Sequence, residues 1–351
     1  MKRLIFFARD LEIGGVERAL VNLLNALAPD YALTLVLQAR RGALLPELDA
    51  RVTLCEAPRS RPGRRLHNAA HLALWALRHA RRYDFSCAFC TDDLPGSRMA
   101  RLASRRACLW VHNDFSLVFR SEREEQAFFR RLRAGWFHRI LFVSRESRAA
   151  FLRLQPRLEA RTAVVGNLVG AARLKKLAAE PCPFRRGEGE TVLLFLGRLD
   201  ERQKRLHRLL TAFRMARAER GDLRLLLVGD GPARGDCERY VRESGLDGCV
   251  TLCGAQPNPY PWLAAADCLV LASDHEGFPL VCMEALALGR ELITTAPVSD
   301  ELLDLRDHAV VCEKNAVSLA AAMAAYSPKR REPLDAAALD AERLRELQAL
   351  F

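Results

Sequence analysis

The sequence predicts an α/β protein of two domains, each a doubly wound parallel sheet of the Rossmann kind. Three observations carry this prediction. A chain of 351 residues is longer than one hydrophobic core usually supports. Short apolar runs alternate with helical patterns in both halves, as buried parallel strands and their crossover helices do. The alternation breaks once, at 174–190, where Pro181, Pro183 and Gly187 indicate a linker.

The first domain is expected to span residues 1–173. Its first strand is followed by the glycine-rich run from Gly14, and its later strands are short and apolar. The expected strands are 3–8, 32–38, 107–111, 139–143 and 162–167, and the expected helices are 19–27 and 145–154.

The second domain, 191–333, has the more regular pattern. A final helix over 334–350 follows its last strand, and we expect the segment 334–351 to pack back on the first domain. The expected strands are 191–196, 223–228, 250–253, 267–272 and 291–295, and the expected helices are 204–219, 233–244, 261–265 and one that contains Glu284.

Composition excludes several classes of protein. With 50% apolar and 28% charged residues, the chain resembles an ordinary soluble protein. No apolar run is long enough to span a bilayer, and the run after Met1 is too short for a signal peptide, so we expect a cytoplasmic protein. Its 11 cysteines are then reduced thiols. Cys87 and Cys90 form a C-x-x-C without a second pair, so we expect no metal site.

Charge is divided unevenly between the halves. Residues 1–180 hold 32 Lys and Arg against 17 Asp and Glu, a balance of +15, whereas residues 181–351 hold 22 and 26, a balance of −4. One interpretation is an arginine-rich solvated surface, and another is nucleic-acid binding, for which no recognition motif is present. We favour the third interpretation, contact with an anionic membrane surface or a phosphorylated glycolipid.

The run E-G-F-P-L-V-C-M-E, from Glu276 to Glu284, is the strongest local signal. Pro279 favours the first turn of a helix, and the unpaired amides of that turn attract anions. Gly277 lets the backbone approach a ligand, and Glu284 on the second turn offers acceptors to a vicinal diol such as a ribose. The alternative is an ordinary loop before an amphipathic helix. The functional interpretation predicts a sugar-nucleotide site.

Two cations follow the first strand of the second domain. Arg198 stands in F-L-G-R-L at the expected strand end, and Lys204 stands at the start of the next helix. Cations there can stabilise the charge of a leaving diphosphate. The sequence holds no D-x-D for a carboxylate-bound metal, so side-chain cations are the remaining candidates. The alternative is surface helix charge, since several arginines are nearby.

Motifs in this order and spacing resemble those of family 4 glycosyltransferases of the GT-B fold, of the bacterial capsule, exopolysaccharide and lipopolysaccharide type. The matches run nearly end to end: G-G-V-E-R from Gly14, W-V-H-N-D from Trp110, V-V-G-N from Val164, G-R-L from Gly197, V-G-D-G-P from Val228, N-P-Y-P from Asn258 and the E-G-F-P run. The resemblance implies a GT-B fold, two Rossmann-like domains facing across a cleft.

The resemblance also implies roles for individual residues. Glu276 matches the acidic residue that faces the donor hexose, and His112 the histidine beside the donor sugar. Arg198 and Lys204 match the pair that binds the donor diphosphate, and Glu284 the carboxylate that holds the ribose. The remaining donor-binding positions, where backbone approaches the sugar or phosphates, are Gly15, Gly277, Phe278 and Leu280.

Two positions depart from the family pattern. From Arg198 to Lys204 is six positions instead of five, so Lys204 could be displaced and Arg202 or Arg205 could replace it. After the helix of Glu284 the family commonly has G-x-P, whereas this chain has Gly289-Arg290-Glu291, without proline.

The function expected from the resemblance is a retaining, metal-independent glycosyltransferase. It would use a hexose on a nucleotide, UDP in our expectation, and a lipid-linked or surface-polysaccharide acceptor at the inner face of the membrane, with no separate cofactor and no nucleic acid. One alternative is a GT-B sugar-nucleotide epimerase, and another is a non-catalytic nucleotide-sugar-binding scaffold. A dinucleotide-binding dehydrogenase fits worst, because the strand after V-G-D-G-P, Val250 to Cys253, ends without the carboxylate that would hold an adenosine ribose.

Overall fold

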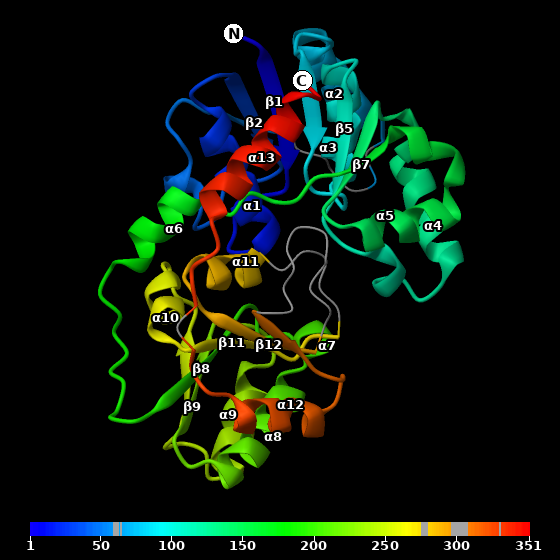
Figure 1. Ribbon diagram of the computed structural model, residues 1–351. Helices are drawn as coiled ribbons and strands as arrows, with labels where there is room; N and C mark the ends of the chain where they lie inside the picture. The colour runs from blue at the N-terminus through cyan, green and yellow to red at the C-terminus, as the bar shows by residue number, and fades with distance from the viewer. Residues whose placement is uncertain (59–62, 64, 275–279, 296–307, 330) are drawn as a thin grey trace. The chain divides into compact units, whose positions relative to one another are not determined.

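A computed structural model describes residues 1–58, 63, 65–274, 280–295, 308–329 and 331–351 of the chain (Figure 1). The chain divides into two compact units. Unit 1 is Met1–Leu168 together with Ala341–Phe351, and unit 2 is Val169–Asp340. Each unit is an α/β domain with its own parallel sheet, as the sequence predicts. Among the described residues, no helix is both long and apolar enough to cross a membrane.

Unit 1 is built on a parallel sheet with the strand order β3-β2-β1-β4-β5-β6-β7. β1 lies inside the sheet and pairs with β2 and β4, and its residues from Leu4 to Ala8 are buried. Burial on both faces explains the near-continuous apolar runs of these strands. The strands are β1 Arg3–Ala8, β2 Ala32–Leu37, β3 Thr53–Glu56, β4 Phe85–Ala88, β5 Ala107–Val111, β6 Arg139–Phe142 and β7 Thr162–Val164.

Three helices of unit 1 begin at side chains that cap them. Asp93, Ser121 and Ser144 accept hydrogen bonds from backbone amides at the starts of α3, α4 and α5. The helices are α1 Gly15–Leu27, α2 Arg65–His79, α3 Leu94–Ala103, α4 Glu122–Leu132 and α5 Arg145–Leu154. Short 3-10 turns are η1 Leu45–Glu47, η2 Phe115–Leu117, η3 Ala134–Trp136 and η4 Pro156–Arg161.

Unit 2 has a parallel sheet with the strand order β10-β9-β8-β11-β12-β13. The chain order reverses between β8 and β11, so this is the switch point at which ligands bind in open α/β sheets. The strands are β8 Thr191–Leu196, β9 Leu223–Val228, β10 Val250–Gly254, β11 Cys268–Leu271, β12 Glu291–Thr294 and β13 Ala309–Val311.

Helices cover both faces of this second sheet. α8 contacts both α9 and α12 on one face, while α10 and α11 lie on the other (Figure 1). The helices are α6 Ala171–Ala178, α7 Glu201–Lys204, α8 Leu206–Glu219, α9 Arg234–Glu243, α10 Tyr260–Ala265, α11 Leu280–Ala287 and α12 Ala316–Ala325, and α13 Ala336–Gln348 spans the division between the units.

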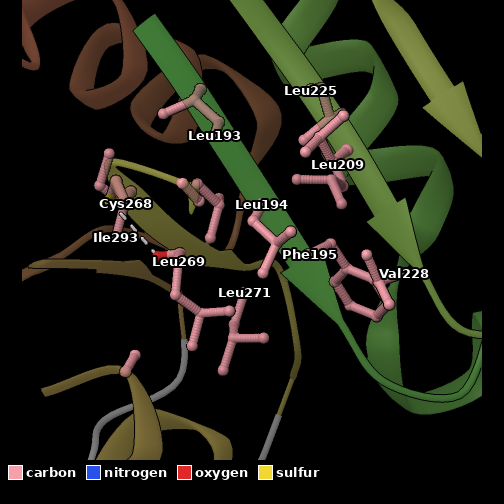
Figure 2. Close-up of a cluster of buried hydrophobic side chains, with 14 of the residues drawn as sticks. Leu193, Leu194, Phe195, Leu209, Leu225, Val228, Cys268, Leu269, Leu271 and Ile293 are labelled. Atoms are coloured by element: carbon pink, nitrogen blue, oxygen red, sulfur yellow. Dashed lines mark hydrogen bonds between the residues drawn. The ribbon is translucent and has the colours of Figure 1, made fainter. Parts of the chain in front are cut away.

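The described core of unit 2 is a cluster of hydrophobic side chains around β8. Figure 2 shows Leu193, Leu194 and Phe195 of β8 between side chains of β9 and β11, with Leu209 of α8 beside them. All four of these residues are fully buried. This packing fixes β8 and β11, and therefore the positions at which the two strands end.

The domain boundaries of the structure differ from those expected. Residues 174–190 include most of α6, and Leu174, Leu177 and Phe184 pack against the core of unit 2. Prolines and charge marked the segment as a linker, but its apolar residues attach it to unit 2. The chain passes between the units at Leu168–Val169 and again at Asp340–Ala341.

The last residues of the chain belong to unit 1. Phe351 is buried against Phe85 and Tyr31, and its backbone oxygen accepts hydrogen bonds from Lys2 Nζ at 3.0 Å and Arg106 at 2.8 Å. On the other side of the division, Asp340 accepts the amides of Val169, Gly170 and Ala171, at 2.6, 2.8 and 3.0 Å, and so caps α6.

Most predicted strands are confirmed to within three residues at either end. Strands 3–8, 107–111, 191–196 and 223–228 and helix 145–154 have the predicted bounds. The predicted helix 204–219 is wrong at its start: α7 ends at Lys204, and Arg205 has a left-handed backbone, φ 52°, before α8 begins. Helices α2, α3 and α4 of unit 1 were not predicted.

Candidate functional site

The carboxyl edge of the unit 2 sheet is held by contacts between two backbone loops. Leu199 donates its amide to Asp230 at 3.0 Å, and Ala233 donates to Leu199 at 2.9 Å. Gly229 lies so close that a Cβ there would be 1.9 Å from the carbonyl oxygen of Gly197, and a Cβ at Gly231 would be 2.5 Å from that of Leu199. The motifs G-R-L and G-D-G therefore fit together as one rigid edge.

Arg198 and Lys204 both lie at this edge. The side chain of Arg198 is 69% exposed and forms an ion pair with Asp200 at 3.0 Å. Lys204 lies in α7, and its Cε is 3.9 Å from the position that a Cβ on Gly197 would occupy. The Lys204 side chain therefore passes beside the residue that precedes Arg198, which brings the two cations to one loop.

The extra residue between these cations is accommodated by α7 and by the left-handed Arg205. Arg205 is paired with Asp274: its guanidinium bonds Asp274 at 2.5 Å, and Arg208 bonds the other oxygen of Asp274 at 2.7 Å. Burial raises the pKa of Asp274, but these hydrogen bonds outweigh that effect and lower it overall. Asp274 also donates its amide to Gln203 at 3.1 Å, which ties the end of β11 to α7.

Glu284 is a buried carboxylate, 5% exposed, on the second turn of α11. The hydroxyl of Tyr260, from the N-P-Y-P motif, donates to its Oε1 at 2.7 Å. Arg173 of α6 lies over the Tyr260 ring, 5.8 Å from its centroid. Sequence reasoning identified Glu284 but not Tyr260, since the pattern gives no sign that the tyrosine of α10 reaches α11.

Leu280, the first described residue of α11, is buried. Glu276, Gly277 and Phe278 lie outside the described residues. α11 ends, and β12 begins, without a proline between them. Gly289, at φ 71°, ends the helix, and Arg290 donates its amide to Ala285 at 2.8 Å, so β12 begins at Glu291 without a proline.

In unit 1, Gly15 begins α1 just after the loop that follows β1. A Cβ at Gly15 would meet no atom within 4 Å, so neither sterics nor the backbone of unit 1 requires glycine there. The carboxylate of Glu17, three residues after Gly14, lies close to Gly14. Burial raises the pKa of Glu17.

His112 follows β5 and is 6% exposed. The rings of Phe89 and Trp110 lie 4.4 and 5.6 Å from its own, centroid to centroid. Within the described chain, neither ring nitrogen makes a hydrogen bond of ordinary geometry. Burial lowers the pKa of His112 to about 3, and the backbone of Phe89 opposes this shift only weakly. The histidine is therefore neutral at pH 7.

Asp93, which the sequence did not single out, lies near the same edge. It follows β4, is 3% exposed, and accepts the amide of Gly96 at 2.9 Å as the cap of α3. Burial raises its pKa to about 6, against the lowering effect of that hydrogen bond. An aspartate followed by a proline in the first helical turn, as in D-L-P-G from Asp93, is a sequence signal of a helix cap. This signal could have identified Asp93 from the sequence.

The cysteines are reduced thiols, and eight of the eleven are buried. Cys87 lies in β4, and burial raises its pKa and that of Cys90 far above the ordinary value for a thiol. No cluster of three or more potential metal-binding side chains occurs in the described ranges.

Residues 190–327 match the sequence profile of the family described as "Glycosyl transferases group 1". That segment contains both Arg198 and Glu284.

Curated relatives are similar mainly in this half. The lipopolysaccharide 1,6-galactosyltransferase of Escherichia coli K12 is 35% identical over 120 residues, 32% of this chain and 32% of its own length. The first curated relatives match over only about a third of their length, 32–37%. An N-acetylgalactosamine-N,N'-diacetylbacillosaminyl-diphospho-undecaprenol 4-alpha-N-acetylgalactosaminyltransferase of Campylobacter jejuni is 22% identical over 84% of this chain and 81% of its own length.

Among solved structures, HepE of Anabaena in complex with UDP and glucose matches with a TM-score of 0.77. The match covers 99% of this chain and 100% of that one, at 18% sequence identity. At that identity the match establishes the fold, GT-B, and confirms the fold class that the sequence predicts.

Proposed function

We propose that this chain, whose residues 190–327 are a group 1 glycosyl transferase domain, transfers a hexose from a nucleotide sugar to an acceptor hydroxyl. One observation carries the proposal: unit 2 has two cations, Arg198 in the loop after β8 and Lys204 beside that loop, and a buried, hydrogen-bonded carboxylate, Glu284. Cations suit a diphosphate and a carboxylate suits a ribose diol. Both groups of a sugar nucleotide thus find matching chemistry within one domain.

The donor in this proposal is a UDP-hexose. Arg198 and Lys204 bind its diphosphate, and Glu284, oriented by Tyr260, accepts hydrogen bonds from the ribose. The choice of UDP is supported by the similar fold of HepE, which was solved with UDP and glucose. Side-chain cations take the part that a metal ion plays in other transferases, so transfer proceeds in EDTA.

Transfer occurs with retention of configuration. The acceptor oxygen attacks the anomeric carbon on the face from which UDP departs, so that one carbon–oxygen bond forms as the other breaks. The proton of the acceptor hydroxyl passes to the departing phosphate oxygen. Glu276 stabilises the developing positive charge of the sugar and forms no covalent bond. Leu280 and the amides of Gly277 and Phe278 lie near the sugar and phosphates in this proposal.

Two residues of unit 1 assist. His112 exchanges hydrogen bonds with a sugar hydroxyl in this proposal, a role suited to a neutral imidazole. Gly15 lets the backbone of α1 approach the donor, which agrees with the open space at that position.

The acceptor is a lipid-linked or surface-polysaccharide glycan at the inner face of the membrane. Similar proteins carry names that refer to lipopolysaccharide and to diphospho-undecaprenol. The balance of +15 over residues 1–180 supports an anionic surface as the place of reaction.

The test is product analysis in EDTA. Purified protein is incubated with UDP-glucose, UDP-galactose or UDP-N-acetylhexosamines and a lipid-linked glycan extract, and the linkage is assigned by NMR. An α-linked product from an α-linked donor supports the proposal. A β-linked product contradicts retention, and a change of the donor sugar without an acceptor identifies an epimerase. Donor binding without any turnover identifies a scaffold.

A further inference from the structure

Tyr260, whose hydroxyl donates to Glu284, is itself connected to helix α6. The tyrosine is 2% exposed, and its backbone amide donates to Oδ1 of Asn258 at 3.2 Å. The Nδ2 of the same asparagine donates to the carbonyl of Leu177, in the last turn of α6, at 2.9 Å. It also donates to the carboxylate of Glu180, just after that helix, at 2.8 Å. One side chain therefore joins the end of α6 to the start of α10, where Tyr260 stands.

A second contact reaches Tyr260 from α6. The guanidinium of Arg173 lies over the tyrosine ring, 5.8 Å from its centroid, and α6 packs against α10. A cation over an aromatic face is attracted by the negative charge density of that face, and the attraction grows where water is excluded. Tyr260 is thus held from α6 at two points, its backbone amide and its ring. Both contacts favour the ring position from which the hydroxyl reaches Glu284.

Helix α6 depends in turn on Asp340. It has 8 residues, and a helix of that length is marginal in water on its own. Gly170 precedes it with φ 74° and has no side chain to cap it. Instead, the carboxylate of Asp340 accepts the amides of residues 169, 170 and 171 at 2.6–3.0 Å. A carboxylate also suits the positive end of the helix dipole.

We propose that Asp340 and Arg173 are positioning residues for Glu284. Asp340 holds α6, Arg173 and the end of α6 hold Tyr260, and Tyr260 directs the carboxylate of Glu284 toward the ribose hydroxyls. Neither Asp340 nor Arg173 touches the donor, and all of these contacts lie within unit 2. The inference rests on the proposed function, in which Glu284 binds the ribose, and deepens it by naming the residues that prepare this carboxylate.

A pair of nucleotides tests the proposal with the full chain. Affinities for UDP and for 2′,3′-dideoxyuridine 5′-diphosphate are measured by calorimetry in EDTA. The second nucleotide lacks both ribose hydroxyls, so the ratio of the two dissociation constants reports how well Glu284 binds them. Wild type should bind UDP at least about tenfold more tightly, because the hydroxyls donate to a charged group. Glu284→Ala should bind both nucleotides nearly equally.

The positioning residues should change this ratio and little else. In Arg173→Met and in Asp340→Asn, we expect the ratio to fall at least about threefold because UDP binds more weakly. Affinity for the dideoxy nucleotide should stay within about twofold of wild type, since it makes no use of Glu284. Arg173→Lys keeps a cation over the ring and should restore most of the ratio. KM for the donor should rise in Arg173→Met while kcat changes little.

Two matched variants separate positioning from general stability. Arg224→Met removes another arginine of unit 2 that lies over an aromatic ring, that of Phe184, at 5.9 Å. Asp335→Asn alters another aspartate that caps a helix, through the amide of Ala338 at 3.0 Å. Both variants should keep the wild-type ratio. Circular dichroism of every variant checks that it is folded.

Different results would overturn the inference and the proposed function. A wild-type ratio in Arg173→Met and Asp340→Asn, with the ratio lost in Glu284→Ala, overturns the inference alone. An equal fall in affinity for both nucleotides also overturns it, since the two residues then only support the fold, and so does an equal fall of the ratio in the matched variants. Equal affinities for the two nucleotides in wild type contradict the ribose role of Glu284, and with it the proposed function.

Discussion

The carboxyl edges of the two sheets are built in different ways. In unit 2 the loops after β8 and β9 hold each other by backbone contacts that only glycine allows, and Asp274 and Glu284 have hydrogen-bonding partners. In unit 1 the edge contains a buried histidine, His112, whose pKa burial lowers, and two carboxyl groups, Glu17 and Asp93, whose pKa values burial raises. One edge is therefore fixed mainly by backbone contacts within the chain, whereas the other holds buried polar groups whose pKa values burial shifts.

The largest effect is expected from breaking the unit 2 edge. Gly229→Ala would place a Cβ 1.9 Å from the oxygen of Gly197, at φ 138°, so we expect a loss of at least about 3 kcal/mol in the free energy of unfolding. Chemical denaturation measures it. Gly248→Ala is the control, since a Cβ there meets nothing within 4 Å. Equal stability of the two variants would show that the loops are not held as described.

The unit 1 edge should respond to acid. Burial lowers the pKa of His112 to about 3 in the folded chain, below the ordinary value of 6.5, so the stability it contributes is present above pH 6.5 and lost as the pH falls toward 3. Between pH 7 and pH 5 this loss is about 2 kcal/mol.

His112→Phe isolates this contribution, because phenylalanine fills the same aromatic surroundings without a proton to bind. Unfolding free energies of wild type and variant are compared at pH 7 and pH 5. The raised pKa values of Glu17 and Asp93 act in the opposite direction but equally in both proteins. If the variant loses as much stability as wild type, the histidine is not buried in the neutral form.

A smaller effect is expected where unit 2 orients its carboxylate. Tyr260→Phe removes the hydrogen bond to Glu284, at a cost of about 1–2 kcal/mol in stability. If Tyr260 orients Glu284 for the ribose, KM for the donor rises several-fold while kcat changes little.

Tyr240→Phe is the matched control, because it also removes a tyrosine hydroxyl of unit 2, which pairs with Thr211 at 3.0 Å. If KM is unchanged in Tyr260→Phe, or raised equally in both variants, Tyr260 does not orient Glu284 for the ribose and contributes only to packing.

The smallest change in stability is expected at Gly15, within about 0.5 kcal/mol of wild type, because alanine fits there and favours a helix. Gly235→Ala is the control, since Gly235 also has open space in the first turn of a helix, α9. Only Gly15→Ala should reduce sugar transfer, by tenfold or more. Equal activities would remove Gly15 from the donor site.

The sequence predicted unit 2 better than unit 1 for physical reasons. In unit 2, strands buried on both faces and loops restricted to glycine give clear sequence patterns, and five of the six described strands were predicted, against five of seven in unit 1. In unit 1, α2 is apolar on both sides, so it lacks the helical periodicity that would have revealed it.

The site residues, too, were predicted from the sequence only in part. Arg198, Lys204 and Glu284 follow from motifs, but the contact of Tyr260 with Glu284 and that of Arg205 with Asp274 join segments 24 and 69 residues apart. Only tertiary packing brings such pairs together, and no local pattern encodes it. The sequence shows the extra residue between Arg198 and Lys204. It did not predict that the chain accommodates this residue with a left-handed backbone at Arg205.

The central claim is that the edge of unit 2 binds a nucleotide diphosphate through Arg198 and Lys204 and its ribose through Glu284. The most direct measurement is thermal unfolding with UDP, GDP, ADP, CMP and NAD in EDTA, for wild type, Glu284→Ala and the exposed control Glu243→Ala. One nucleotide, UDP in this account, should stabilise wild type and the control by about 2.7 kcal/mol at 100 times its dissociation constant, and Glu284→Ala much less. Stabilisation by NAD alone, by no nucleotide, or equally in all three proteins would contradict it.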